Sequence, residues 1–452
     1  MNVAKLQVVA TVRASPASRG APLNFQRWDA HAVLRASRNY PVASAGTLPD
    51  ATIEHSQAHS NQWAARLYTL AGHNRATAYD ALPAAGLAPA TKETQAEIYR
   101  RQFPASCSGP GASFLLSHSY CNNGIGSMIH VVGTQLAIAV AANRTLVMAP
   151  GACPAWGDNE TCPDGASGFF ECFLAPISSC TAADAAQAGA DVVAVTGTSD
   201  DYMSTLPPGV LLPQRVPAVL ADRVHHLGMT EHELKYWWRG QSAAYLLRFN
   251  ERTIAAVREM RLKPGMLVAH SGARGNATGG PRVLSFPLPP GVVSAHMRSG
   301  YDKGAEMSRV LPSAFFRAVE GLVKNAPISA RRVIFLSTEG ADTIESMRRI
   351  VTRHANAWTL LYTATPRGVG GSGAASREAA VHLPSAAVQR LGVSTQQHLL
   401  NLLIALECSA FVGTRGSNWN RLIDELRCIW VPNCNGIYVE AGDNAAEYGW
   451  RR

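Results

Sequence analysis

Two stretches in the C-terminal half of this chain place charged and polar residues directly after an apolar run. In the first, VVSAHMRSGYDKGAE, the apolar run ends in His296 and Arg298, and a charged segment follows with Asp302, Lys303 and Glu306. An arginine suits a phosphate group because its charge is permanent and its N–H groups donate in pairs. A carboxylate such as that of Glu306 can act as a general base where its surroundings raise its pKa. The alternative interpretation of the charged segment is an ordinary solvated loop.

The second stretch, SAFVGTRGSNWNRLIDELR, combines an apolar run, a polar turn and an amphipathic helical pattern. The free N–H groups at the start of a helix attract an anion, and Ser417 and Asn418 can add hydrogen bonds to a phosphate. A plain N-cap turn explains the same residues equally well. The sequence contains no GxxxxGK[ST], HExxH, DxD or GxSxG pattern, and no GxGxxG follows the first C-terminal strand. P-loop, dehydrogenase, metalloprotease and simple serine-hydrolase chemistry are therefore disfavoured.

Alternating strands and helices are expected to position these residues. In the C-terminal half the pattern predicts strands at 292–297, 333–337, 359–362, 410–413 and 429–431, with helices at 313–324, 343–354, 395–407 and 420–426. Further upstream it predicts a helix at 128–142, strands at 145–149, 192–195 and 210–212, and a helical stretch at 231–260. Strands separated by helices indicate βαβ units and a parallel sheet. We therefore expect two α/β domains, with the cleft between them as the ligand site.

The chain divides into four parts on this interpretation. Residues 1–104 form a stem or peripheral region, partly disordered, with helical turns near 61–71. Residues 105–262 form an N-terminal α/β domain, and the Gly- and Pro-rich residues 263–290 connect it to the next domain. Residues 291–445 form a C-terminal Rossmann-like domain whose parallel sheet binds the ligand.

Composition limits the class of ligand. The 452 residues are 47% hydrophobic and 16% charged, which indicates folded domains with large cores. Lysine and arginine number 41 against 32 acidic residues, for a net charge of +9. The basic residues are spread along the chain rather than gathered in an arm. A small anionic ligand such as a nucleotide therefore fits better than a nucleic acid.

Cysteines and sequons indicate the secretory lumen. Of the nine cysteines, six cluster at positions 107, 121, 153, 162, 172 and 180, and three lie at 408, 428 and 434. No pair has CxxC spacing, so the first cluster suits disulfides, with buried free thiols as the alternative. Three Asn-x-Thr sequons begin at Asn143, Asn159 and Asn276. No apolar stretch reaches the roughly 18 residues that span a bilayer, so no membrane anchor is visible in the sequence.

Five segments in order resemble the α1,6-fucosyltransferase family, which includes the core fucosyltransferase and the nodulation-factor enzyme. They span roughly residues 107–432: CNNGIGSMIHVV with NRTLV, KYWWRGQSAAYLLR, HMRSGYDKGAE, IFLSTEG, and HLLNLLIALECSAFVGTRGSNWNRLIDEL. The resemblance implies a GT-B-like fold of two Rossmann-like α/β domains facing a cleft. It also implies GDP-fucose as the donor substrate, inverting transfer without a cofactor or metal, and a glycan or glycoprotein acceptor on the N-terminal domain. A location in the secretory pathway, in the Golgi lumen, follows from the same resemblance.

Carried over by position, the resemblance gives each residue a role. Arg298 would contact the donor β-phosphate and His296 would hold the nucleotide. Glu306 would be the base for the acceptor hydroxyl, tuned by Lys303. The remaining donor-binding positions would be Asp302, Thr338, Glu339, Asn401, Ser417 and Asn418.

The sequence departs from the family at two informative positions. The second arginine of the family's donor motif corresponds to Ser299, and its guanine-reading aspartate corresponds to Asn401. Two alternatives therefore stand beside a fucosyltransferase: an enzyme of the same fold with another nucleotide-sugar donor, and a catalytically inactive glycan- or nucleotide-binding protein.

Overall fold

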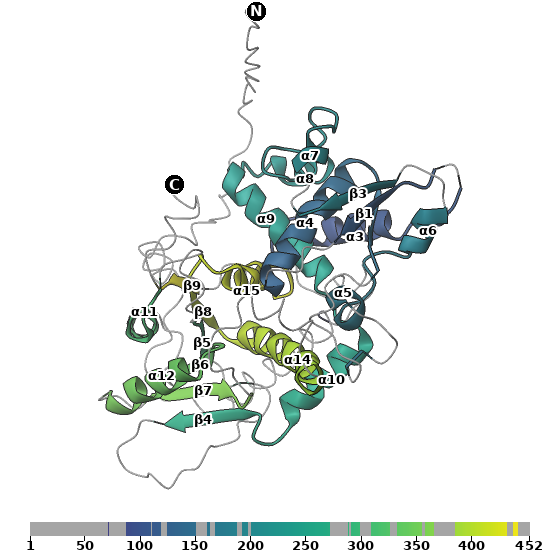
Figure 1. Ribbon diagram of the computed structural model, residues 1–452. Helices are drawn as coiled ribbons and strands as arrows, with labels where there is room; N and C mark the ends of the chain where they lie inside the picture. The colour runs from purple at the N-terminus through teal and green to yellow at the C-terminus, as the bar shows by residue number, and fades with distance from the viewer. Residues whose placement is uncertain are drawn as a thin grey trace, which may run out of the picture.

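A computed structural model of the chain contains two separate β-sheets, each flanked by helices (Figure 1). The structure describes residues 71, 87–109, 111–118, 124–150, 161–162, 168–187, 192–197, 200–271, 288, 291–298, 309–325, 332–354, 358–365, 385–431 and 437–441, with side chains in 385–393 excepted. The statements below refer to these residues.

The smaller sheet has three parallel strands in the order β2-β1-β3, which span Phe114–His118 (β1), Thr145–Met148 (β2) and Val192–Thr196 (β3). The helices of this part of the chain are α3 (Thr91–Gln102), α4 (Ile125–Ala141), α5 (Phe169–Phe173), α6 (Ala182–Gln187), α7 (Asp200–Met203), α8 (Ala218–His225), α9 (Glu231–Leu246) and α10 (Glu251–Leu262). Helix α4 is apolar on most of its surface and is buried against β1, β2 and α9.

The larger sheet has six strands in the order β4-β7-β6-β5-β8-β9. They span Leu267–Ser271 (β4), Val293–His296 (β5), Val333–Ser337 (β6), Thr359–Thr363 (β7), Ala410–Gly413 (β8) and Ile437–Glu440 (β9). All neighbours pair in parallel except β4, which is antiparallel to β7. The helices of this part are α11 (Pro312–Asn325), α12 (Ala341–Arg353), α14 (Ser385–Glu407) and α15 (Asn418–Ile429). The described chain is thus α/β with parallel strands, as the sequence predicts.

The larger sheet is covered on both faces, which explains its fully apolar strands. In β6, Ile334 and Leu336 pack into one core with α11 and α12, whereas Val333 and Phe335 pack into the core that contains α14. Alternate side chains of a strand point to opposite faces, so a strand buried on both sides has no polar alternation. The core on the α14 side continues into the smaller sheet and joins the two parts of the chain.

Three parallel helices, α4, α9 and α15, form the junction, and Figure 1 shows α15 between the two sheets. Glycines bring the helices close together. A Cβ at Gly126 would lie 2.8 Å from the backbone carbon of Asn418, one at Gly133 would lie 2.7 Å from Ser242 Oγ, and one at Gly240 would lie 3.3 Å from the backbone oxygen of Glu425. In these helix pairs, residues near the start of one helix contact residues near the start of the other, and later residues contact later residues. The three helices therefore run in the same direction, with their N-terminal ends at the same end of the junction.

Most predicted elements are confirmed, with shifts at their ends. The strands at 333–337 and 410–413 match to the residue. The predicted helical stretch 231–260 is two helices, because Asn250 caps α10 by accepting a hydrogen bond from the Thr253 N–H (2.8 Å). Helix α14 begins at Ser385 instead of 395. The turns expected at 61–71 lie outside the described residues, apart from Ala71.

Two predicted strands are wrong. Residues 210–212 contribute only an isolated bridge between Leu211 and Pro217. Ile429, the first residue of the segment 429–431, is the last residue of α15. The final described strand is β9, later in the chain. Trp430 and Val431 are buried but do not form a strand. A short apolar run in the sequence does not distinguish a strand from another buried segment, which explains the second error.

Three elements lie where no regular structure was expected. Strand β1 was not predicted, helix α3 falls within the expected stem, and β4 falls within the expected connection 263–290. Helix α3 is packed rather than peripheral, since Ile98 and Gln102 are fully buried.

Disulfides cross-link the N-terminal part of the chain, as the cysteine cluster predicts. Cys107 pairs with Cys180, and Cys162 pairs with Cys172. Cys408 is a buried free thiol, and Cys428 is also buried. None of the helices in the described ranges has the length and hydropathy needed to cross a bilayer.

Candidate functional site

The first predicted site residues meet at the carboxyl ends of β5 and β6. These strands pair in parallel with His296 opposite Ser337, so the residues that follow them lie side by side. His296 Nδ1 lies 2.8 Å from Ser337 Oγ. Two residues further on, the Arg298 guanidinium lies 3.2 Å from the Glu339 carboxylate. Both members of this pair keep part of their side chain exposed, so the arginine is accessible to a ligand.

His296 is a buried, neutral imidazole. Burial lowers its pKa to about 4, with Arg298 and His398 adding to the shift and Glu339 opposing it. Its Nε2 is buried and has no hydrogen-bond partner among the described residues. A buried polar atom without a partner is costly, so Nε2 is a natural contact for a bound molecule.

Thr338 and Asn401 lie near the same edge of the sheet. The Thr338 Oγ1 accepts a hydrogen bond from the Gly340 N–H (3.2 Å), which shapes the turn after β6. Asn401 lies on α14, and its Oδ1 accepts from Thr363 Oγ1 at the end of β7 (3.0 Å). Both side chains are buried.

Ser417 begins α15 without capping it. It is the N-cap residue, yet its side chain makes no capping hydrogen bond. The first N–H groups of α15 therefore lack their usual side-chain acceptor, which is the condition for binding an anion at a helix start. The ring of Trp419 lies 6.3 Å from that of His296, so this helix start faces the end of β5.

Asn418 links α15 to α4. Its side-chain amide lies 2.6 Å from Ser127 Oγ and 3.0 Å from His130 Nδ1. The side chain is therefore engaged by the junction, and the backbone N–H is the part of Asn418 that belongs to the helix start.

Asp302, Lys303 and Glu306 lie outside the described residues, as do Asn159 and Asn276. Within the described ranges, no three histidine, cysteine, aspartate or glutamate side chains gather as a metal site would require. The predicted residues that the structure does bring together are His296, Arg298, Thr338, Glu339 and the start of α15 at Ser417.

A buried charged network underlies the helix start. His130 Nε2 lies 2.8 Å from Glu425 Oε2, and Arg239 Nε lies 3.0 Å from Glu425 Oε1. Burial favours the neutral form of Glu425, but Arg239 and His130 outweigh this effect and lower its pKa. Burial and Arg239 lower the pKa of His130, so the imidazole is neutral and Glu425 is ionised. The network ties α4, α9 and α15 together.

Cations gather toward the N-terminal end of this junction. Burial lowers the pKa of Lys235 on α9, and the neighbouring Arg239, Arg215 and Arg421 lower it further. His232 behaves in the same way, with burial first and then Lys235 and Arg415. The arginines around Lys235 therefore place positive charge at this end of the junction.

Helix geometry adds to this potential. Helix α9 begins eight residues before Arg239, α15 seven before Glu425 and α4 five before His130. At 1.5 Å per residue these helix starts lie roughly 8–12 Å from the network, within about one turn of each other. The starts of α4 and α15 have no side-chain cap and no acidic residue in the first turn, so two positive dipole ends point the same way, whereas Thr230 and Glu233 cap the start of α9. Together with Arg298 and Ser417, this region is suited to hold a multiply charged anion such as a diphosphate.

Sequence reasoning missed His130, Lys235, Arg239, Arg415 and Glu425. Lys235 and Arg239 have i, i+4 spacing, which places both on one face of α9 and could have been noticed. Arg415 lies in the polar turn before α15, where its N–H donates to the Glu440 carboxylate (3.1 and 3.2 Å). Only the fold brings these segments together, because His130 and Glu425 are 295 residues apart.

The chain was compared with known proteins. No family model matches it, and no curated protein does. The solved structures to which it is similar are fucosyltransferases, the class that the sequence segments resemble. NodZ α-1,6-fucosyltransferase soaked with GDP-fucose has a TM-score of 0.32 and 13% identity over 70% of this chain and 92% of that chain. A mutant of Arabidopsis thaliana FUT1 in complex with GDP has a TM-score of 0.35 and 9% identity over 84% and 78%. POFUT1 in complex with GDP has a TM-score of 0.33 and 10% identity over 74% and 99%.

Proposed function

We propose that this protein is a glycosyltransferase that transfers fucose from GDP-fucose to a glycan or glycoprotein. The observation that carries the proposal is the positive region formed by Arg298, Lys235, Arg421 and the uncapped start of α15 at Ser417. It lies at the carboxyl ends of the larger sheet, where open parallel sheets bind their ligands. A nucleotide diphosphate supplies the negative charge that this region attracts. The two sheets then correspond to a GT-B-like arrangement, with the donor on the larger one.

Each described residue has a role in donor binding on this proposal. The Ser417 hydroxyl, the Asn418 backbone N–H and the guanidinium of Arg298 bind the diphosphate, while the Ser417 N–H donates to Thr414 O in the turn before α15. The buried Nε2 of His296 contacts the nucleotide, and Thr338 and Glu339 line its site. Glu339 gives up part of its contact with Arg298 when the phosphate arrives, which is feasible because the pair is partly exposed. The positive region stabilises the charge that develops on GDP as it leaves.

The transfer step on this proposal is an inverting displacement. The acceptor hydroxyl oxygen forms a bond to the anomeric carbon while the bond from that carbon to the β-phosphate oxygen breaks. Glu306 takes the hydroxyl proton, Lys303 tunes that carboxylate, and Asp302 lies in the same donor-binding segment. GDP departs with the bonding electrons, and no metal or cofactor is required. The two disulfides and the sequons support a location in the secretory pathway, and we propose the Golgi lumen.

A second donor is favoured by one specific observation. Asn401 carries an amide where the family reads guanine with a carboxylate, and its Oδ1 already accepts from Thr363. An amide N–H donates a hydrogen bond, whereas a carboxylate only accepts. A nucleotide sugar with another base is therefore the alternative donor on the same fold.

Nucleotide-induced thermal stabilisation tests the proposal. GDP at about 100 times its dissociation constant should raise the free energy of unfolding by about 2.7 kcal/mol, and UDP and ADP should have smaller effects. Adding EDTA should change nothing if donor binding requires no metal. A larger effect of UDP or ADP would favour the other donor, and no effect of any nucleotide would overturn the enzyme hypothesis.

Two matched variants separate binding from transfer. Glu306→Gln should bind GDP as the wild type does and lose transfer from GDP-fucose, because only the base is removed. Lys235→Gln should weaken GDP binding several-fold, whereas Lys324→Gln on α11 should not. Normal turnover by Glu306→Gln would contradict its assignment as the base.

A further inference from the structure

Trp419 brings an aromatic ring to the candidate site. It is the second residue of α15, directly after Asn418 and the N-cap residue Ser417. Its ring centroid lies 6.3 Å from that of His296 at the end of β5 and 6.5 Å from that of His398 on α14. Trp419 thus meets rings from two other elements beside the start of the helix.

The helix turns the Trp419 side chain away from α4. The side chain of Asn418 points to α4, where its amide nitrogen lies 2.6 Å from Ser127 Oγ. Successive residues of an α-helix are rotated by about 100° around its axis, so Trp419 projects in another direction. Its contacts with His296 and His398 show that this direction is toward the carboxyl end of β5 and toward α14. The helix therefore presents its first N–H groups and its indole ring to the same edge of the larger sheet.

The indole ring is held by packing, yet Trp419 remains partly exposed. Trp419 packs against the core that contains α14, and its exposure is intermediate. His398 is exposed, and its Nδ1 lies 2.7 Å from the backbone oxygen of Ser394, which fixes the orientation of the imidazole. Aromatic rings that are already held in place in the free protein lose little entropy when a ligand covers them.

The His296 imidazole adds a polar atom beside the indole. Its Nδ1 lies 2.8 Å from Ser337 Oγ, and its buried Nε2 has no hydrogen-bond partner among the described residues. A nucleobase has a flat apolar face that stacks on aromatic rings and a polar edge that forms hydrogen bonds. The Trp419 ring suits the face, and His296 Nε2 suits the edge. The start of α15, one residue before Trp419, suits the diphosphate of the same molecule.

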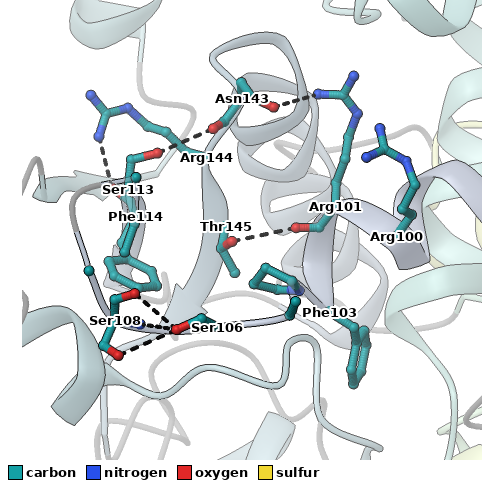
Figure 2. Close-up of a pocket in the computed structure, with 15 residues that line it drawn as sticks. Arg100, Arg101, Phe103, Ser106, Ser108, Ser113, Phe114, Asn143, Arg144 and Thr145 are labelled. Carbon is teal, nitrogen blue, oxygen red and sulfur yellow. Dashed lines mark hydrogen bonds between the residues drawn. The ribbon is translucent and has the colours of Figure 1, made fainter.

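The described residues also form a pocket at the amino ends of β1 and β2, which Figure 2 shows. The Ser113 hydroxyl at this pocket donates to Asn143 O (3.2 Å). The Thr145 hydroxyl donates to Arg101 O (3.4 Å). Both hydroxyls are therefore engaged within the protein, so this pocket suits the polar edge of a base less well than the carboxyl ends of the larger sheet do.

We propose that Trp419 is the platform on which the base of the donor nucleotide stacks, which rests on the proposed function because it takes a nucleoside diphosphate as the ligand. Stacking involves the flat face of a base, and every base has such a face. The platform therefore serves GDP and a donor with another base alike, and the choice between bases is left to groups at the polar edge. Trp419 is a binding residue that holds the donor and takes no part in the bond changes.

Calorimetric titration of the full chain with GDP and with inorganic diphosphate tests the proposal, because only GDP has a base. Trp419→Leu keeps an apolar side chain but removes the ring, so it should weaken GDP binding roughly tenfold and ADP binding by a similar factor. The same variant should bind inorganic diphosphate as the wild type does. Trp419→Phe keeps a ring and should recover most of the affinity for GDP. Urea unfolding checks that each variant folds.

Tryptophan fluorescence supplies a signature that a purely structural role would not produce. GDP should quench part of the fluorescence of the wild type when its base stacks on the indole, and inorganic diphosphate should not. Trp419→Phe should lose this quenching although it still binds GDP. Trp358→Phe is the matched control and should keep the quenching, because Trp358 is buried in the core on the α12 side of the larger sheet.

Two results would overturn the proposal and leave the proposed function standing. One is an equal loss of affinity for GDP and for inorganic diphosphate in Trp419→Leu, since the indole would then act by supporting the helix start. The other is unchanged GDP affinity in the folded Trp419→Leu variant. Binding of no nucleotide by the wild type would overturn both, so the two failures are distinguishable.

Discussion

The guanidinium of Arg298 lies 3.2 Å from the carboxylate of Glu339, across the ends of two adjacent parallel strands. The two residues follow positions 296 and 337, which pair in register, so the sheet itself sets their distance. The ion pair keeps the arginine oriented toward the site in the absence of a ligand. A phosphate can then replace a carboxylate at an arginine that is already positioned.

Arg298→Gln should therefore affect binding more than folding. Loss of a paired arginine–phosphate contact should weaken GDP binding by roughly tenfold or more. The free energy of unfolding should fall by less than about 1 kcal/mol, because the pair with Glu339 is partly exposed. Calorimetric titration with GDP and urea unfolding measure the two effects. Arg348→Gln, which breaks another partly exposed pair, is the control and should leave GDP binding unchanged.

His296 predicts an acid-sensitive fold. Its pKa is about 4 in the folded chain because of burial, against an ordinary value of 6.5 when exposed. Below pH 6.5 the His296 imidazole binds a proton in the unfolded chain but stays neutral in the folded chain. The free energy of unfolding therefore falls as the pH falls from 6.5 toward 4. The full loss is about 3 kcal/mol at 1.36 kcal/mol per pKa unit.

The measurement is urea unfolding at several pH values for the wild type and His296→Asn. Between pH 6.5 and 4 the free energy of unfolding of His296→Asn should fall less than that of the wild type. His225→Gln, at an exposed position on α8, should show the same fall as the wild type. Identical pH dependence in wild type and His296→Asn would show that the buried imidazole does not titrate as argued. GDP should slow the decline if it occupies the site.

The sequence predicted the elements whose patterns are local. Val333–Ser337 and Ala410–Gly413 are continuous apolar runs bounded by polar residues, and their shortness favours a strand buried on both faces over a helix. The residues that follow strands were also predictable, because carboxyl ends of parallel strands share one edge. His296 and Arg298 were predicted as candidate site residues by this argument, whereas Glu339 was predicted from the resemblance.

Contacts between distant segments were not predictable. The isolated histidine at position 130 lies in an apolar helix, and nothing nearby in the sequence indicates its partner Glu425 on another sheet's helix. The role of Asn418 changed for the same reason, since its amide is held by Ser127 on α4 rather than left free at the helix start. Helix packing decided both positions.

Glu425→Gln should destabilise the junction strongly. Glu425 is fully buried and faces both Arg239 and His130, so the neutral amide leaves the largely buried Arg239 guanidinium without this counter-charge. Removing one partner of a buried ion pair costs about 3–5 kcal/mol. Glu345→Gln, whose partners Arg348 and Arg349 are largely exposed, should cost less than about 1 kcal/mol. Urea unfolding compares the two, and a loss below 1 kcal/mol in Glu425→Gln would mean that the network contributes little.

Gly126→Ala tests whether close contact between α4 and α15 positions the helix start. The new Cβ would lie 2.8 Å from the Asn418 backbone carbon, and backbone atoms cannot move aside as a side chain can. Helix α15 should shift, so GDP binding should weaken although alanine itself favours a helix by about 1 kcal/mol. Gly133→Ala meets only side-chain atoms, of Ser242 and Leu246, and should have a smaller effect, and Gly321→Ala on α11 meets nothing within 4 Å and should gain stability. Unchanged GDP affinity in Gly126→Ala would show that this contact between α4 and α15 does not control the anion site.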